Sequence, residues 1–206
     1  MAIDQSELVA HPAELGGRIG FWGGIVGAVQ AAVVLIALLV ADPADAFRFS
    51  YPFTPGVYSI AEVTFAAQHV TLIIGVLALA GVVRTSRLGR YGLLGAAVGL
   101  ALLTLMELFA ITVADAAADD PRAELVSSLY GIPTVITGIA LVVGGIGIAR
   151  SGVLAGWSRW IVLATGAFVF VALIPALVGP DIAGRIAIGV WMLLFAALAR
   201  AAYATR

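Results

Sequence analysis

The 206-residue chain contains no cysteine and no lysine. Without cysteine there can be no disulfide, thiolate metal site, iron–sulfur cluster or thiol nucleophile. Without lysine there can be no Schiff base with retinal or pyridoxal phosphate and no P-loop lysine. These two absences exclude several large classes of enzyme, and no residue pattern in the chain indicates another cofactor.

Charged residues are also scarce, at 11% of the chain against 62% hydrophobic residues. A water-soluble domain needs more charge than this to cover its surface, so the balance predicts a polytopic membrane protein. The formal net charge of −1 leaves no basic surface for a nucleic acid. We therefore expect the lipid bilayer, and no nucleic acid, as a partner of this chain.

Six long apolar stretches occupy most of the sequence and are joined by short loops. A bilayer core about 30 Å thick requires roughly 20 apolar residues of helix, and each stretch meets or approaches that length. The expected spans are residues 20–41, 59–83, 91–114, 125–149, 160–178 and 185–203. The sequence predicts an all-α, six-helix transmembrane bundle that forms a single membrane domain over residues 20–206, preceded by a tail at residues 1–19.

The distribution of arginine predicts the orientation of the bundle. With six spans, eight of the eleven arginines fall on the side that holds both termini, and three fall on the other side. Positive residues favour the cytoplasmic side, so we expect both termini in the cytoplasm and the protein in the inner (plasma) membrane. Asp4, Glu7 and Glu14 replace the basic start of a signal peptide, so the first span is expected to stay in the membrane.

Four glycines of the first span form two overlapping pairs at four-residue spacing, Gly20 with Gly24 and Gly23 with Gly27. Small residues at this spacing allow another helix backbone to approach closely. The approaching helix could belong to the same chain, to a partner membrane protein or to a second copy in a homo-oligomer. The spacing predicts a close helix contact and leaves these three alternatives open.

Proline residues in one connection and in two spans predict irregular structure at these places. The connection at residues 42–58 is the longest, and it is rich in proline and aromatic residues. We expect it either to lie in the outer headgroup layer or to fold as a lid over the outer mouth of the bundle. Pro133 and Pro175 fall inside the fourth and fifth spans, where each frees a backbone carbonyl, so we expect a kink at each.

Ionisable residues inside spans are costly to bury and are therefore candidates for function. The second span holds Glu62 and His69, which are seven residues apart and share a helix face. His69 lies 18 residues before Arg87 in the tight loop to the third span, and Glu107 lies 20 residues after it. Because each residue of helix rises about 1.5 Å, His69 and Glu107 should lie at nearly the same height in the outer half of the bilayer, where they can pair if they face each other.

Hydroxyl groups are expected to join this pair. Thr104 lies one helical turn from Glu107, while Tyr130 and Thr134 lie one turn apart in the fourth span at a similar depth. The candidate intramembrane polar or proton site comprises Glu62, His69, Thr104, Glu107, Tyr130 and Thr134. Such a cluster can lock helix packing, hold a proton or cation, or catalyse a reaction. We expect no metal, since no ligand spacing such as HxxxH is present, and we assign no catalytic residue.

Three segments carry a resemblance to other proteins. The sequence FSYPF at residues 49–53, His69 in the following span and GWSRW at residues 156–160 resemble a group of uncharacterised multi-spanning membrane proteins of high-GC, actinobacterial-type bacteria. The resemblance covers most of the chain and supports the six-span topology. It implies no molecular function.

Two classes of function remain open. The first is a non-enzymatic accessory or assembly partner in the membrane. The second is a proton-linked or cation-linked small-solute transporter, or the substrate-binding subunit of a larger importer, with its polar site in the outer half of spans two to four. The two classes differ in whether that region encloses a water-accessible cavity or a dry, packed seam.

Overall fold

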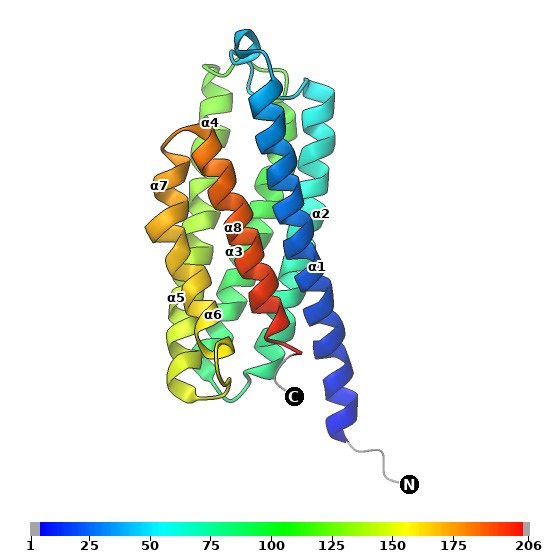
Figure 1. The fold of residues 1–206 in the computed structure, drawn as a ribbon, viewed down its shortest axis with the longest axis vertical. Helices are drawn as coiled ribbons and strands as arrows, with labels where there is room; N and C mark the ends of the chain where they lie inside the picture. Colours follow the sequence, from blue (N-terminus) through cyan, green and yellow to red (C-terminus); the bar gives the residue numbers. More distant parts are fainter. Residues whose placement is uncertain (1–4, 204–206) are drawn as a thin grey trace.

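The computed structural model of the protein describes residues 5–203, with the side chains of residues 12–203. Within this range the chain is helical and forms no β-strand, and six spans are long and apolar enough to cross a membrane (Figure 1). The spans are Pro12–Val40, Pro55–Val82, Arg87–Val113, Pro121–Ser151, Ser158–Leu177 and Asp181–Arg200. The predicted all-α class and the number of spans are confirmed, whereas the orientation of the termini stays a prediction.

The spans are built from eight α-helices and two short segments of other helix types. The α-helices are α1 (Gln5–Val40), α2 (Pro55–Val82), α3 (Arg87–Ala110), α4 (Pro121–Leu129), α5 (Gly131–Ser151), α6 (Ser158–Phe168), α7 (Ile174–Leu177) and α8 (Asp181–Arg200). The 3₁₀-helix η2 (Ile111–Val113) ends the third span, and the π-helix η3 (Val169–Leu173) joins α6 to α7. The 3₁₀-helix η1 (Pro43–Asp45) lies in a connection. The fourth span consists of α4 and α5.

Several helices begin earlier than hydropathy predicts. α1 starts at Gln5, so most of the expected tail at residues 1–19 is helical, while residues 1–4 of that tail lie outside the described residues. α2 starts at Pro55 rather than at residue 59, directly after an extended Thr54. Proline suits the first helical turn because the N–H it lacks would have no partner there. Hydropathy marks where a helix enters lipid, which differs from where the helix begins.

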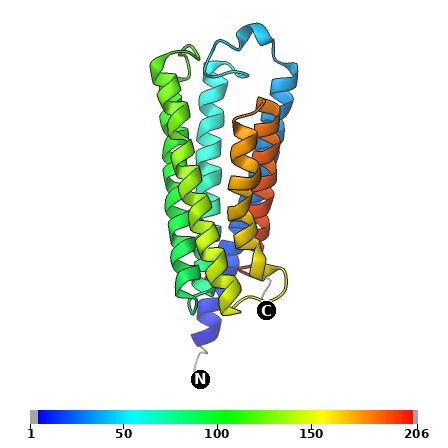
Figure 2. The ribbon, with the colours of Figure 1, turned by 90° about the vertical axis from the view of Figure 1, so that its left-hand side faces the viewer.

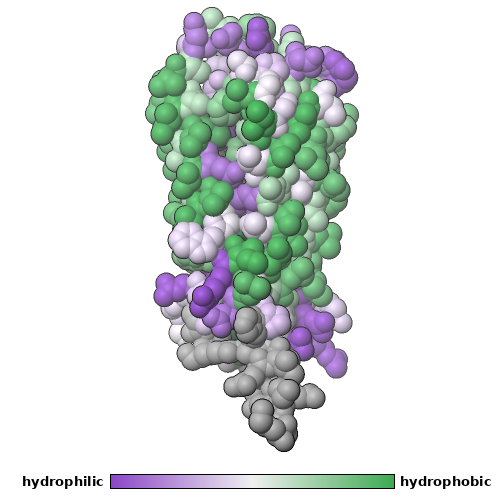
Figure 3. Space-filling view, turned by 90° about the vertical axis from the view of Figure 1, so that its right-hand side faces the viewer, coloured by the Kyte–Doolittle hydropathy of each residue, from purple (hydrophilic) through white to green (hydrophobic). Residues whose placement is uncertain are grey.

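The six spans form one bundle, in which α1 packs against α8 and α2, α3 packs against α2 and α5, and α6 packs against α5. Helix α1 begins and α8 ends at the same end of the bundle (Figure 1). We call the opposite end, which holds the connections 41–54, 114–120 and 178–180, the outer end. Figure 3 shows a broad apolar belt between polar bands at the two ends, as expected of a surface that faces lipid.

The four glycines singled out in the first span (Gly20, Gly23, Gly24 and Gly27) all lie against helices of the same chain. A methyl group added at Gly20 would lie 2.5 Å from the Cα atom of Gly75 in α2, and one at Gly24 would lie 2.6 Å from the backbone nitrogen of Ala196 in α8. The intramolecular alternative accounts for all four positions. A partner protein or a second copy stays a prediction that these contacts do not test.

The α-helix is interrupted near Pro133 and near Pro175, the two positions where the sequence predicts kinks. In the fourth span the helix breaks at Tyr130, between α4 and α5 and three residues before Pro133. In the fifth span the π-helix η3 directly precedes the short helix that holds Pro175. Proline has no N–H, so the carbonyl one turn earlier loses its partner and the local helix geometry adjusts. The break at Tyr130 matters most, because this residue belongs to the candidate site.

The two long connections at the outer end are paired through their backbones. Phe49 N donates to Ala116 O at 3.0 Å, and Ala118 N donates to Phe47 O at 2.7 Å. Arg48 and Ala117 between them form an isolated antiparallel β-bridge. This pairing folds the first connection back over the outer end of the bundle, which favours a lid over a loop spread in the headgroup layer.

Asp120 fixes the start of α4, the helix that leads to Tyr130. Its carboxylate accepts a hydrogen bond from the backbone nitrogen of Arg122 at 2.8 Å and another from the Arg122 guanidinium at 2.9 Å. These hydrogen bonds from Arg122 hold the pKa of the Asp120 carboxyl below its usual range. The carboxylate thus stays ionised at a helix N-terminus, where the helix dipole favours a negative charge.

The fifth and sixth spans are shorter than the others, with 20 residues each against 27 to 31 in the first four. At about 1.5 Å per residue the difference amounts to roughly 10 Å or more of helix. Figure 2 shows the consequence, since the turn between α7 and α8 (orange) ends well below the neighbouring helices at the outer end. The outer part of the bundle therefore has less helix on this side.

Candidate functional site

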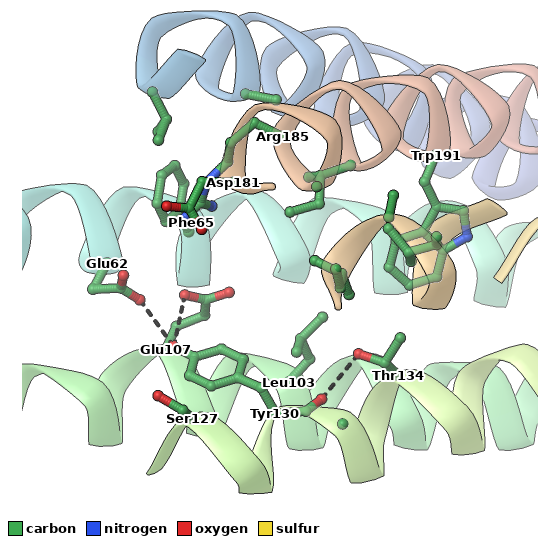
Figure 4. A pocket seen from close by; sticks show the side chains of 18 of the residues that line it. Glu62, Phe65, Leu103, Glu107, Ser127, Tyr130, Thr134, Asp181, Arg185 and Trp191 are labelled. Carbon is green, nitrogen blue, oxygen red and sulfur yellow. Dashed lines mark hydrogen bonds between the residues drawn. The ribbon is translucent and has the colours of Figure 1, made fainter. Parts of the chain in front are cut away.

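A cavity of about 1060 Å³ extends from the outer connections toward the middle of the bundle. It is bordered by α1, α2, α3, the break between α4 and α5, α7 and α8, with the connection 41–54 at its outer limit (Figure 4). Most lining side chains are apolar, among them Phe65, Leu103 and Trp191. Small-molecule sites typically have volumes of roughly 300–1,000 Å³ and mostly apolar walls, so this cavity has the size and character of a ligand site.

Two glutamates meet at one wall of the cavity. Glu62 of α2 is 5% exposed and Glu107 of α3 is 7% exposed. The Tyr130 hydroxyl lies between them, 3.2 Å from Glu62 Oε2 and 3.2 Å from Glu107 Oε2 (Figure 4). We call these three residues, which come from three spans, the Glu–Tyr–Glu cluster. The break in the fourth span places Tyr130 here.

His69 lies beside this cluster without a hydrogen bond to it. Its Nδ1 atom is 3.8 Å from Glu107 Oε1, which is longer than a hydrogen bond. The residue is only 5% exposed, and Nδ1 has no hydrogen-bond partner among the residues that the structure describes. His69 and Glu107 therefore face each other at the predicted height, but the hydrogen-bond partner of Glu107 is Tyr130.

The hydroxyls of the two threonines assigned to the site donate hydrogen bonds to backbone carbonyls one turn earlier in the same span. Thr104 donates to the carbonyl of Leu100 at 2.9 Å and is not among the described residues that line the cavity. Thr134 lines the cavity, but its hydroxyl donates to the carbonyl of Tyr130 at 2.9 Å. The structure thus separates Thr104 from the site, whereas Thr134 stabilises the turn that carries Tyr130.

The cavity includes charged and polar residues that the sequence analysis did not assign to it. Arg185 of α8 is half-buried and reaches toward α2, with Asp181 one turn earlier (Figure 4). Gln30 of α1 also lines the cavity, and its Oε1 atom is buried without a partner within the described part of the chain. Arg185 is one of the three arginines that the topology assigns to the outer side, and it lies inside the sixth span because α8 begins at Asp181. An arginine within a span is itself a sign of function.

Polar contacts between helices hold the bundle together on the inner side of the cluster. Gln68 of α2 donates to the carbonyl of Gly23 in α1 at 3.0 Å and lies 3.4 Å from Met192 Sδ in α8. The Trp191 indole donates to the carbonyl of Thr165 at 3.2 Å, which joins α8 to α6. These contacts fix four helices around the inner part of the cavity.

The site offers two carboxyl groups, a phenol and an imidazole at one wall of a cavity. These groups exchange protons and attract cations. Within the described residues, no three His, Cys, Asp or Glu side chains are grouped so that they could hold a metal ion. Comparisons of the chain with protein-family models, curated proteins and solved structures find no match. Function is therefore inferred from the geometry of the cavity.

Proposed function

We propose that this membrane protein binds a small solute in its outer cavity, with a proton or cation at the Glu–Tyr–Glu cluster linked to binding, and that it is not an enzyme. One observation carries the proposal: Glu62 and Glu107 border a cavity of about 1060 Å³ rather than a filled helix seam. Ionisable groups that only lock helices together need no space beside them. A transporter or a solute-binding subunit does need such space.

The arginine distribution supports access to the cavity from outside the cell. If both termini are cytoplasmic, as the positive-inside rule predicts, the outer end of the bundle faces away from the cytoplasm. The cavity extends toward this end and is bordered there by Arg48, Phe49 and Tyr51. In an inner membrane the cavity would then receive solutes from the external side.

The first function predicted from the sequence, an accessory or assembly partner, is compatible with the same fold. It assigns no role to the cavity or to the unpaired polar atoms of Gln30 and His69. Solute binding accounts for these features, and we therefore favour it over the accessory role. Whether the chain transports the solute itself or passes it to a partner chain is part of the same proposal.

Cysteine labelling tests the proposal, because the chain has no native cysteine. Thr134→Cys puts a thiol on the cavity wall. Thr137→Cys is the matched control, since Thr137 lies one turn further along α5 and is fully buried. An impermeant methanethiosulfonate reagent added from outside should modify Thr134→Cys and leave Thr137→Cys unmodified.

Two results would count against solute binding. If Thr134→Cys is as unreactive as Thr137→Cys, while Cys at the exposed residue Thr54 reacts, the region is a dry seam and the proposal fails. If Thr134→Cys reacts, then amines, amino acids and sugars are added one at a time. The class that binds should slow the labelling, and no slowing by any class would leave the accessory role as the better explanation.

A further inference from the structure

The protons of the Glu–Tyr–Glu cluster can be counted from its geometry. A tyrosine hydroxyl has one proton and can donate to only one carboxylate. The Tyr130 oxygen nevertheless lies 3.2 Å from a carboxyl oxygen of Glu62 and 3.2 Å from one of Glu107. The second contact is a hydrogen bond only if a glutamic acid donates its own proton to the tyrosine oxygen. The cluster is therefore satisfied when it holds one carboxyl proton.

Among the neighbouring groups, Tyr58 lies close enough to Glu62 to donate a hydrogen bond to that carboxyl group, but its proton does not lie between Tyr130 and either glutamate. The other titratable and charged side chains that line the same cavity are Tyr58 and His69 of α2, Arg185 and Asp181 of α8, and Arg48 and Tyr51 of the outer connection. His69 Nδ1 stays 3.8 Å from Glu107 Oε1. Among residues 12–203, Arg185 has no carboxylate oxygen within ion-pair distance. α1 contributes the uncharged Gln30.

The charges inside the cavity balance when the cluster holds one proton. One ionised glutamate then faces one guanidinium, that of Arg185, while Arg48 and Asp181 are exposed and of opposite sign. Loss of the proton would add an uncompensated negative charge in a buried site, which is unfavourable. A single positive charge entering the cavity would restore the balance.

Independent features of the cavity point to a bound cation with an apolar body. His69 Nδ1 is unpaired beside Glu107 in a residue only 5% exposed, and Gln30 Oε1 is a second buried atom without a partner in the described chain. A carbonyl oxygen such as Gln30 Oε1 can accept a hydrogen bond from an ammonium group. The aromatic rings of Phe65 and Trp191 line the cavity, and such rings attract cations as well as apolar groups.

We infer that the cavity takes an organic monocation with an apolar body and exchanges it for the proton of the Glu–Tyr–Glu cluster. When the cation enters, one glutamic acid O–H bond breaks and its proton passes to the external solution. The carboxylate that remains pairs with the cation, so the net charge of the cavity does not change. This inference rests on the proposed function, since it names the class of solute and the ion that is exchanged.

Calorimetry on the full chain in lipid nanodiscs tests the exchange. Benzyltrimethylammonium is the cationic ligand, with N,N-dimethylbenzamide as a neutral compound, phenylalanine as a zwitterion and benzenesulfonate as an anion. Titrations in buffers of different ionisation enthalpy give the number of protons released. We expect one proton per benzyltrimethylammonium bound, and an affinity that falls about tenfold per pH unit of acidification where proton and cation compete.

Two substitutions separate the cluster from other carboxyl groups. Glu107→Gln keeps the shape of the side chain and offers Tyr130 a permanent amide partner, but it has no titratable proton. Proton release should fall from one to near zero, and the dependence of affinity on pH should disappear. Glu124→Gln removes an exposed carboxyl of α4 that does not line the cavity, and it should leave both quantities unchanged. The proton count of the unsubstituted chain stands even if Glu107→Gln fails to fold.

The outcomes distinguish this inference from the proposed function. Binding of benzyltrimethylammonium without proton release, or with equal affinity at every pH, overturns the exchange and leaves solute binding intact. Tighter binding of phenylalanine, benzenesulfonate or N,N-dimethylbenzamide overturns the choice of a cation. No binding of any of the four compounds overturns the inference, and an unreactive Thr134→Cys in addition overturns the proposed function.

Discussion

Replacing Gly24 with alanine is a direct test of the packing between α1 and α8. An added Cβ atom would lie 2.6 Å from the backbone nitrogen of Ala196 and 2.6 Å from the backbone oxygen of Met192. Non-bonded heavy atoms normally approach to about 3.5–4.0 Å, so the two helices must separate by about 1 Å at this point. Both opposing atoms belong to the α8 backbone, so no side-chain rotation can relieve the contact.

The expected magnitude is the difference between two effects. Inserting a methylene into a well-packed interior costs about 1–3 kcal/mol. Alanine favours a helix over glycine by about 1 kcal/mol, which offsets part of that cost. We therefore expect Gly24→Ala to lower the free energy of unfolding by up to about 2 kcal/mol, and by about 1–3 kcal/mol relative to an alanine substitution that meets no close contact. The measurement is reversible unfolding by sodium dodecyl sulfate in mixed micelles, followed by far-UV circular dichroism.

Gly189→Ala is the matched control, because Gly189 lies in α8 and faces α1 in the same interface. An added Cβ atom there would lie 3.5 Å from Ala31 Cβ, which is an ordinary contact distance. This variant should lose no stability and could gain up to about 1 kcal/mol. Free energies of unfolding that agree within about 0.5 kcal/mol for the two variants would refute this reasoning.

Two further predictions concern the site and the topology. Buried polar pairs in membrane proteins couple by roughly 0.6 kcal/mol on average and by about 1.7 at most, so Tyr130→Phe with Glu107→Leu should destabilise less than the sum of the single changes. Strict additivity would show that these residues do not interact. Cysteines at Thr54 and Ala118 should react with impermeant thiol reagents on intact cells, and one at Thr85 should not, because eight of eleven arginines lie on its side. Labelling at Thr85 would reverse the orientation.

The number and approximate positions of the spans could be predicted because lipid imposes a simple length requirement on apolar helix. The interruptions near Pro133 and Pro175 could also be predicted, since proline always removes a backbone donor. The pairing of the two outer connections could not, because it depends on which carbonyls meet after the spans have packed. The start of α8 at Asp181 was missed because charged residues in its first turns lower the hydropathy there.

Only part of the candidate site could be predicted from the sequence, because the sequence indicates height along a helix but not how the helix is rotated. Helical rise and the tight loop at Arg87 bring Glu107 to the height of His69, and this inference requires only the sequence. The rotation of each helix about its axis is set by tertiary packing, so the sequence did not indicate that the Tyr130 hydroxyl would take the place of His69 as partner of Glu107. The sequence also could not show that Arg185 lines the same cavity, because the cavity forms only when the helices have packed.

The two sides of the outer cavity are held differently. The side of the paired outer connections is tied by hydrogen bonds between connections, whereas within residues 5–203 the side of the α7–α8 turn is not. The hydrogen bonds of Phe47 and Phe49 tie the α1–α2 connection to the α3–α4 connection. In the described chain, the backbone bonds around the α7–α8 turn, such as that from Gly179 N to Ala176 O, are all local. The π-helix η3 also interrupts the α-helical hydrogen-bond pattern directly before α7. We therefore expect the α7–α8 turn, rather than the paired connections, to move when a solute enters the cavity from the external side.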